Sequence, residues 1–268
     1  MSAMRCALTI AGSDPGGGAG IQADLKTFAA LGVWGMSAIT SITVQNTLGV
    51  GDVADVAFGV VAAQIRAVAS DIGVDAAKTG MLSSAAIVEA VADACADVEI
   101  ANLVVDPVFV SKHGDPLLRL DAVEALRRRI LPLATLVTPN LPEASGLAGF
   151  EVTGRDDMPR AAAAILELGA GAVLIKGGHL GGPSADDLFT DRARNEWLEG
   201  ERIETRDTHG TGCVLSAAIA AHLARGAEVL DAARLGKAFV TEAIRHGVRV
   251  GGGIGPVDPA WRETMAER

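Results

Sequence analysis

The hydrophobic and polar positions along the chain follow two alternating patterns. Short runs of Val, Ile, Leu and Ala have the composition of strands buried on both faces of a parallel sheet. The longer segments between them carry apolar residues at helical spacing. The first pattern predicts strands at residues 5–11, 36–44, 75–78, 102–105, 135–137 and 172–175. The second predicts helices at residues 19–31, 55–70, 84–95, 121–130, 155–168, 213–223 and 230–248.

The order of these elements predicts the fold class. Strands that alternate with helices are typical of an α/β protein whose mostly parallel central sheet has helices on both faces. Residues 187–190 and 195–198 have the pattern of a short antiparallel pair, and Ser83 is the expected N-cap of the helix ending at residue 95. The Gly- and Pro-rich tail at residues 251–268 is expected on the surface. Because no repeat or linker interrupts the pattern, residues 1–268 are predicted to form one domain.

Composition narrows the class of protein. Hydrophobic residues make up 49% of the 268 residues and aromatic residues only 3%, so the core is built from aliphatic side chains. The net charge of −10 argues against a nucleic-acid partner, which normally requires a basic face. Three cysteines without metal-ligand spacing indicate a reducing compartment. We find neither a signal-peptide pattern nor an apolar run of membrane-spanning length, so a cytoplasmic protein without membrane contact is expected.

Polar motifs follow the predicted strands, whereas the connections from helix to strand carry few polar or glycine residues. Gly, Asp, Lys, Asn, Gln or Thr stands directly after at least six strands. Ligands of open parallel sheets bind at the carboxyl ends of the strands. These motifs are therefore expected to meet at one edge of the sheet and form an active site there.

The motif with the strongest chemical content runs from residue 207 to residue 213. Thr208, Gly210, Thr211 and Gly212 lead into an Ala- and Leu-rich helix whose first turn contains Cys213. Free backbone N–H groups and the positive end of a helix dipole bind anions, above all phosphate. The same position is expected to lower the pKa of Cys213 and make it a thiolate nucleophile or base. The alternative is an ordinary glycine-rich helix cap.

A second glycine-rich segment, residues 12–20, does not fit the familiar nucleotide motifs. It lacks the Lys-Ser/Thr pair that closes a P-loop, and its spacing lacks the third glycine of a dinucleotide fingerprint. Phosphates are therefore expected at the 210–212 motif instead.

Charged residues after three other strands indicate phosphate and metal binding. Lys176 ends a buried strand and is expected to reach toward the 210–212 glycines, although a solvated lysine gives the same pattern. Asp106 and Glu143, with Asn140 three residues before Glu143, are candidates for the one or two carboxylates that hold Mg²⁺ with a nucleotide. The alternatives are a turn at Asp106 and a helix-dipole charge at Glu143.

The remaining candidates are residues that suit a flat polar heterocycle. Gln45 offers an amide and Met81 a soft apolar side chain at the same edge of the sheet. Asp24 lies one turn after the 12–20 segment and could point into the cleft, or it could be a helix-dipole partner. Core packing is the alternative for Met81, and tying down a strand-end turn is the alternative for Gln45. His209 and His179 receive no assignment.

Taken together, the motifs resemble those of a known family over nearly the whole chain, in order. They stand at residues 11–28, 78–82, 106–108, 138–144, 176–179 and 208–213. The chain resembles the bacterial hydroxymethylpyrimidine/phosphomethylpyrimidine kinases of thiamine biosynthesis, which belong to the ribokinase-like superfamily. The resemblance implies a three-layer ribokinase-like fold without a separate lid domain. It also implies a homodimer.

The resemblance further implies an activity and a set of roles. Two phosphoryl groups would pass in turn from Mg-ATP to 4-amino-5-hydroxymethyl-2-methylpyrimidine and to its monophosphate. The implied roles are a pyrimidine pocket at Gly12, Asp24, Gln45 and Met81; an anion hole at Thr208, Gly210, Thr211, Gly212 and Cys213; ATP-phosphate binding at Lys176; and a magnesium region at Asp106, Asn140 and Glu143. Pyridoxal kinase activity is the closest alternative, and a non-catalytic pyrimidine- or vitamin B6-binding protein is a further one.

Overall fold

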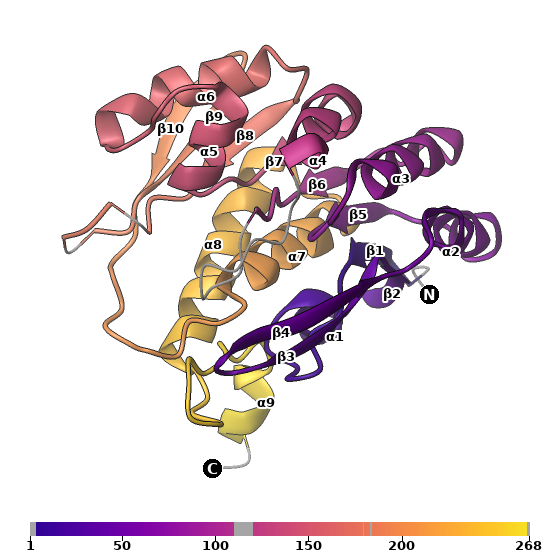
Figure 1. Cartoon of the computed structure of the whole chain (residues 1–268). Coiled ribbons are helices and arrows are strands. Elements are labelled where there is room, and N and C mark those ends of the chain that lie inside the picture. The colour runs from indigo at the N-terminus through magenta and orange to yellow at the C-terminus, as the bar shows by residue number, and fades with distance from the viewer. Residues whose placement is uncertain (1–3, 110–119, 179, 183, 267–268) are drawn as a thin grey trace.

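The centre of the molecule is a mixed, mostly parallel sheet (Figure 1). The computed structural model describes residues 4–109, 120–178, 180–182 and 184–266. Within these residues, eight strands form the sheet in the order β10-β9-β8-β7-β6-β5-β1-β2, and only β9 and β10 run antiparallel to their neighbours. The strands are β1 (Cys6–Ala11), β2 (Trp34–Ile39), β5 (Ala76–Thr79), β6 (Leu103–Val105), β7 (Leu136–Val137), β8 (Ala172–Ile175), β9 (Asp187–Asp191) and β10 (Asn195–Leu198).

Helices cover both faces of the sheet and produce three layers. One face carries α2 (Phe58–Asp71), α3 (Ala85–Asp97), α4 (Leu120–Ala125) with the π-helical turn η1 (Leu126–Ile130), α5 (Leu141–Ala148) and α6 (Met158–Leu166). The other face carries α1 (Gly20–Ala30), α7 (Thr211–Ala224) and α8 (Val229–Arg245). Alternate residues of β1 enter opposite cores: Leu8 and Ile10 pack on the first face, and Ala7 packs on the second. The expected three-layer α/β architecture is therefore confirmed.

Helix α7 is apolar around its whole circumference because all of its sides are covered. It packs between α1 and α8 and against the sheet, so ten of its residues are buried. This burial fixes the start of α7 at the carboxyl edge of the sheet, beside the ends of β1, β5 and β6 (Figure 1).

The strand predicted at residues 36–44 is wrong as a single element. The chain leaves the main sheet at Thr40, whose backbone N–H donates to Ala11 O and whose hydroxyl donates to Met81 O. The following residues form β3 (Ser41–Asn46), which pairs with β4 (Gly49–Asp55) in a separate two-stranded sheet. We call β3 and β4 the flap.

The flap also corrects two neighbouring predictions. Because β4 extends to Asp55, helix α2 begins at Phe58 and not at residue 55. Ser83 does not cap α3: the N-cap is Ser84, and the hydroxyl of Ser83 donates to Asp55 Oδ1 at 2.6 Å. That bond ties the base of the flap to the sheet edge.

The C-terminal tail contains a helix that the sequence did not predict. This short helix is α9 (Trp261–Ala266). Ile254 N–H donates to Thr47 O, so the segment before α9 contacts the turn of the flap. Residues 110–119, which connect the predicted strand at 102–105 to the predicted helix at 121–130, lie outside the described residues, as does His179. None of the described helices is both long enough and apolar enough to cross a membrane.

Candidate active site

The first turn of α7 lies against the glycine-rich loop that follows β1. Gly210 is the N-cap of α7 and has φ of 82°, a conformation that favours glycine. A Cβ atom added to Gly210 would stand 1.8 Å from Gly18 O, so the two glycine-rich segments pack backbone to backbone. The hydroxyl of Thr211 donates to Thr208 O at 2.8 Å and closes the turn before the helix.

The next two backbone N–H groups of α7 find no acceptor in the part of the chain that the structure describes. Among the described residues, nothing accepts a hydrogen bond from the N–H of Gly212 or Cys213. Together with the dipole of a fourteen-residue helix, these donors provide the anion-binding geometry expected for this motif.

Lys176 brings a positive charge to the same place. It directly follows β8, and its Nζ lies 2.9 Å from Asp106 Oδ1 and 3.7 Å from Glu143 Oε2. A Cβ atom added to Gly212 would stand 3.5 Å from Lys176 Nζ, so the ammonium lies against the first turn of α7, as the sequence predicted. Burial acts to lower the pKa of Lys176, but the carboxylates of Asp106 and Glu143 outweigh it and hold the pKa above the ordinary value.

Asp106, Asn140 and Glu143 lie around this ammonium, at the ends of β6 and β7. Asn140 and Glu143 form a capping box at the start of α5: Asn140 N–H donates to Glu143 Oε2 and Glu143 N–H donates to Asn140 Oδ1. Burial raises the pKa of Glu143 to about 7, although Lys176 counteracts it. Glu143 thus stands in the first turn of α5, where the helix-dipole alternative placed it, and its carboxylate also reaches Lys176.

These residues can contribute to a cation site but cannot complete one alone. The described residues contain no group of three or more His, Cys, Asp or Glu side chains able to hold a metal ion. Asp106 is buried, and its Oδ2 faces Gly212 at the anion-binding turn. A magnesium ion usually takes one or two carboxylates together with water and nucleotide phosphates. The donor set fits that arrangement.

Cys213 differs from the prediction. We expected the helix N-terminus to lower its pKa, but burial of the sulfur raises the pKa to about 12. The ammonium of Lys78 counteracts this effect, whereas the carboxylates of Asp24 and Asp106 add to it. Although the residue keeps some exposed surface, it is a neutral thiol at physiological pH.

Asp24 does not point into a cleft, which was one of the two interpretations that the sequence allowed. Its side chain is fully buried, and its carboxylate lies 3.1 Å from Nζ of the equally buried Lys78. Thr9 donates a further hydrogen bond to it at 2.6 Å. Asp24 therefore lies in a closed ion pair beneath the site, and Lys78 is a charged residue that the sequence did not single out.

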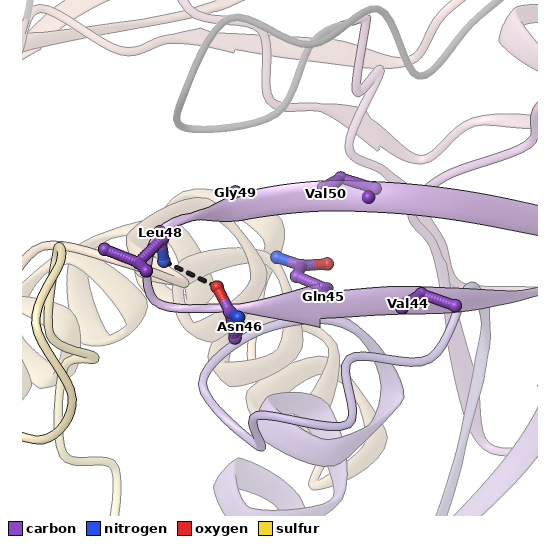
Figure 2. A pocket seen from close by; sticks show the side chains of 7 residues that line it. Val44, Gln45, Asn46, Leu48, Gly49 and Val50 are labelled. Atoms are coloured by element: carbon purple, nitrogen blue, oxygen red, sulfur yellow. Dashed lines mark hydrogen bonds between the residues drawn. The ribbon is translucent and has the colours of Figure 1, made fainter.

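The other heterocycle candidates surround the base of the flap. A Cβ atom added to Gly12 would stand 3.4 Å from Met81 Sδ and 3.5 Å from Ser41 O, so these residues are neighbours. Gln45 lies on β3, next to a β-bulge in the pairing with β4. A cavity of about 590 Å³ is lined by flap residues that include Gln45 (Figure 2). The lining residues are Val44, Gln45, Asn46, Leu48, Gly49, Val50 and Gly51.

His209, which the sequence left unassigned, belongs to this site. It is buried, and its Nε2 lies 2.8 Å from Asp14 Oδ2 and 3.3 Å from the amide of Gln45. Burial acts to raise the pKa of Asp14, but hydrogen bonds from His209 and from the Gly16 and Ala19 backbone lower it. A histidine beside a glycine carries no signal in the sequence that would identify such distant partners.

Comparison with known proteins agrees with this geometry. A family model described as phosphomethylpyrimidine kinase matches residues 14–258. The chain belongs to the phosphomethylpyrimidine kinase family. A Streptomyces coelicolor member named hydroxymethylpyrimidine/phosphomethylpyrimidine kinase is 54% identical to it, over 95% of this chain and 94% of the relative. Both the family and the ribokinase-like fold expected from the sequence are thus confirmed.

Solved structures include two kinds of similar kinase. The ADP complex of a Bacillus subtilis pyridoxal kinase has a TM-score of 0.90 and 44% identity, over 97% of this chain and 99% of that one. A phosphomethylpyrimidine kinase from Clostridium difficile has a TM-score of 0.80 and 44% identity, over 90% of this chain and 99% of that one. The family's fold therefore accommodates both substrate classes.

Proposed function

We propose that the protein phosphorylates 4-amino-5-hydroxymethyl-2-methylpyrimidine with ATP and then phosphorylates the resulting monophosphate. The observation that carries this proposal is the position of Lys176 Nζ against Gly212 in the first turn of α7. It joins a fixed ammonium to free backbone donors at one point. Family membership and the name of the Streptomyces coelicolor relative support the substrate.

In this proposal the first turn of α7 binds phosphate, and Lys176 stabilises its charge. Backbone N–H groups from Gly210 to Cys213 hold the phosphate that is transferred, with Thr208 and Thr211 closing the turn. Lys176 stabilises charge on the phosphate oxygens. Because phosphoryl transfer passes through a loose transition state, positioning and electrostatics supply most of the catalysis.

Asp106 and Glu143 would hold the magnesium ion that accompanies ATP, and Asn140 keeps Glu143 in place through the capping box. The ion supplies neutralisation of the nucleotide phosphates. Lys176 lies between the two carboxylates and stays charged, because its pKa is above the ordinary value. Asp106 and Glu143 would therefore both pair with Lys176 and bind the magnesium ion.

In this proposal Cys213 does not act as a thiolate base. Because burial raises its pKa to about 12, Cys213 is a neutral thiol at pH 7. Its backbone N–H completes the anion hole, and its side chain contacts the reacting group as a thiol. Transfer then depends on Lys176 and the α7 donors more than on proton removal by Cys213.

The pyrimidine lies between the flap and the end of β1 in this proposal. Gly12 leaves room beside Met81 Sδ for a flat ring, and the amide of Gln45 reads the aminopyrimidine edge. An amide offers the acceptor and the donor that complement a 4-amino group beside a ring nitrogen, as in adenine recognition. Asp24 supports the pocket from below through Lys78 and Thr9, without direct contact with the ring.

A substrate panel tests the proposal. ADP release is measured with Mg-ATP and each of three acceptors: the aminopyrimidine, its monophosphate and pyridoxal. We expect kcat/KM for the aminopyrimidine to exceed that for pyridoxal at least tenfold. The similarity to the Bacillus subtilis pyridoxal kinase makes pyridoxal the second candidate substrate. A larger kcat/KM for pyridoxal would reverse the assignment, and no acceptor-dependent ADP release would indicate a binding protein.

We also propose that the protein is a homodimer formed through the outer face of the flap. Side chains alternate along β3: Ser41 and Thr43 are buried toward the site, whereas Ile42 and Val44 are exposed. Val44 and Leu48 are 63% and 68% exposed, so this face of the flap presents apolar side chains to solvent. Such a surface is unusual for a monomer. A second copy supplies a self-complementary partner for it.

Light scattering tests the dimer directly. We expect the wild-type mass to be twice that of the chain, and Val44→Glu to give a monomer that remains folded. Leu235→Glu is a matched control, because Leu235 is exposed on α8, away from the flap. A wild-type monomer would contradict the proposal.

We place the activity in the cytoplasm, in keeping with the three free cysteines.

A further inference from the structure

His209 joins three segments that are far apart in the sequence. It belongs to the turn before α7, and its ring contacts the glycine-rich loop after β1: a Cβ atom added to Gly18 would stand 2.7 Å from His209 Cδ2. Its Nε2 lies 2.8 Å from Asp14 Oδ2 in that loop and 3.3 Å from Gln45 in the flap. The ring therefore lies between the anion-binding turn and the residue assigned to substrate recognition.

The charge state of Asp14 fixes which nitrogen of His209 carries hydrogen. Asp14 is buried and accepts hydrogen bonds from the backbone N–H groups of Gly16, Gly18 and Ala19. A carboxylate is an acceptor only, so the group that faces it at 2.8 Å is a donor. His209 Nε2 must therefore be the N–H nitrogen.

This donor in turn fixes the amide of Gln45. Gln45 Nε2 lies 3.3 Å from His209 Nε2, which would bring two donors together. On the other side, Gln45 Oε1 lies 3.3 Å from Thr43 Oγ1, whose hydrogen is already donated to Ser13 O at 2.7 Å. A half-turn of the amide exchanges its oxygen and nitrogen, which are assigned from the hydrogen-bond network. Gln45 then donates to Thr43 Oγ1, and its oxygen shares, at 3.3 Å, the Nε2–H that His209 donates to Asp14.

We propose that His209, held by Asp14, is a positioning residue that fixes the Gln45 amide with its oxygen toward His209 and so sets substrate choice. One N–H and one lone pair of the amide then remain side by side for a ligand. That pair matches a 4-amino group beside a ring nitrogen, and it does not match a ring hydroxyl without an exocyclic amine. Figure 2 shows the Gln45 side chain between β3 and β4, where it lines the flap cavity. This inference rests on the proposed function.

Variants of His209 separate positioning from simple loop stability. His209→Leu removes the N–H donor, whereas His209→Gln keeps an N–H near the position of Nε2. We expect His209→Leu to lower kcat/KM for the aminopyrimidine at least tenfold, mainly through KM, and to change kcat/KM for pyridoxal less than threefold. His209→Gln should stay within about threefold of wild type. In the Gln45→Leu background, His209→Leu should leave the ratio between the two substrates unchanged.

A spectroscopic measurement tests the same arrangement without any substrate. The protein is labelled with ¹⁵N at its five histidines, and the His209 signals are assigned from their loss in His209→Gln. We expect a protonated Nε2 at pH 8 in the ligand-free protein. An unprotonated Nε2 would overturn the proposal. Two kinetic results would also overturn it: His209→Leu lowers kcat/KM equally for the aminopyrimidine and for pyridoxal, or His209→Leu changes the ratio between the two substrates as strongly in the Gln45→Leu background as in the wild type. If the wild type does not phosphorylate the aminopyrimidine, the proposed function fails while the Nε2 measurement still decides the arrangement.

Discussion

Lys176 Nζ lies 2.9 Å from Asp106 Oδ1, and both atoms lie against Gly212 in the first turn of α7. A phosphate at that turn would therefore meet an ammonium whose position is already fixed by a buried carboxylate. A flexible lysine would have to lose rotamer freedom at the moment of reaction, whereas this one is preorganised. The pair thus links the end of β6 and the end of β8 to the start of α7.

We expect Lys176→Ala to lower kcat by about 10²-fold or more, because a preorganised charge is lost at the transferred phosphate. Lys176→Arg should recover only part of this loss, because the planar guanidinium group of arginine does not fit where a compact ammonium is held in a crowded position. Steady-state kinetics over a range of ATP concentrations measures the effect. Thermal unfolding of each variant shows whether the fold is intact. If Lys176→Ala is folded and fully active, Lys176 has no role in catalysis.

Cys213 should react slowly with alkylating agents because its pKa is about 12 and only the thiolate is nucleophilic. The rate of carbamidomethylation, followed by mass spectrometry at Cys213, should be far below that of free glutathione at pH 8 and should still rise above pH 10. We expect Cys213→Ala to keep kcat within about tenfold of wild type, which is less than the 10²–10⁴-fold that loss of a general base costs. Alkylation at pH 8 as fast as glutathione would mean that the thiolate is present.

The buried pair of Asp24 and Lys78 should stabilise the fold and not substrate binding. Asp24→Asn leaves the ammonium of Lys78 without its partner, which typically costs about 3–5 kcal/mol of unfolding free energy. Urea denaturation measures this cost. Asp97→Asn, which breaks the exposed pair with Arg66, is the matched control and should cost about 1 kcal/mol or less. If Asp24→Asn has wild-type stability and a raised KM for the aminopyrimidine, Asp24 contacts the substrate directly and this account of the pair is wrong.

Glu143 should give the ligand-free protein a distinct pH dependence. Its folded-state pKa is raised from 4.5 to about 7, so the folded protein holds this proton more tightly than the unfolded chain does. Its contribution to stability is therefore greatest below pH 4.5 and is lost as the pH rises through about 7. We expect the free energy of unfolding of wild type, relative to Glu143→Gln, to fall between pH 5 and pH 8. A constant difference across that range would mean that burial does not raise the pKa of Glu143.

The sequence predicts the layers of this fold well but not the path of the chain at Thr40. The apolar pattern continues from Met36 to Val44, so it shows no break between β2 and β3. The break depends on hydrogen bonds from Thr40 to Ala11 and Met81, which are distant in sequence. Ile42 and Val44 continue the pattern although they are exposed, because an apolar pattern does not distinguish a core from an apolar outer face.

The same limit applies to the site. Motifs at the ends of strands located Lys176 and Asp106, because parallel strands bring their carboxyl ends to one edge. The glycine-rich start of a helix located the α7 turn. The helix dipole at Cys213 is a local effect that the sequence contains, but the desolvation that outweighs it comes from packing. The partners of His209, namely Asp14 and Gln45, are 195 and 164 residues away from it in the sequence and reach it only in the folded structure.

The most direct test of the proposed activity is a time course of ³¹P NMR with the purified protein, Mg-ATP and 4-amino-5-hydroxymethyl-2-methylpyrimidine. We predict that a phosphomonoester signal rises first, that a diphosphate signal replaces it, and that two ADP form for each pyrimidine consumed. Lys176→Ala should slow both steps. If pyridoxal is phosphorylated while the pyrimidine stays unmodified, or if ADP forms without any phosphorylated pyrimidine, the proposed function is contradicted.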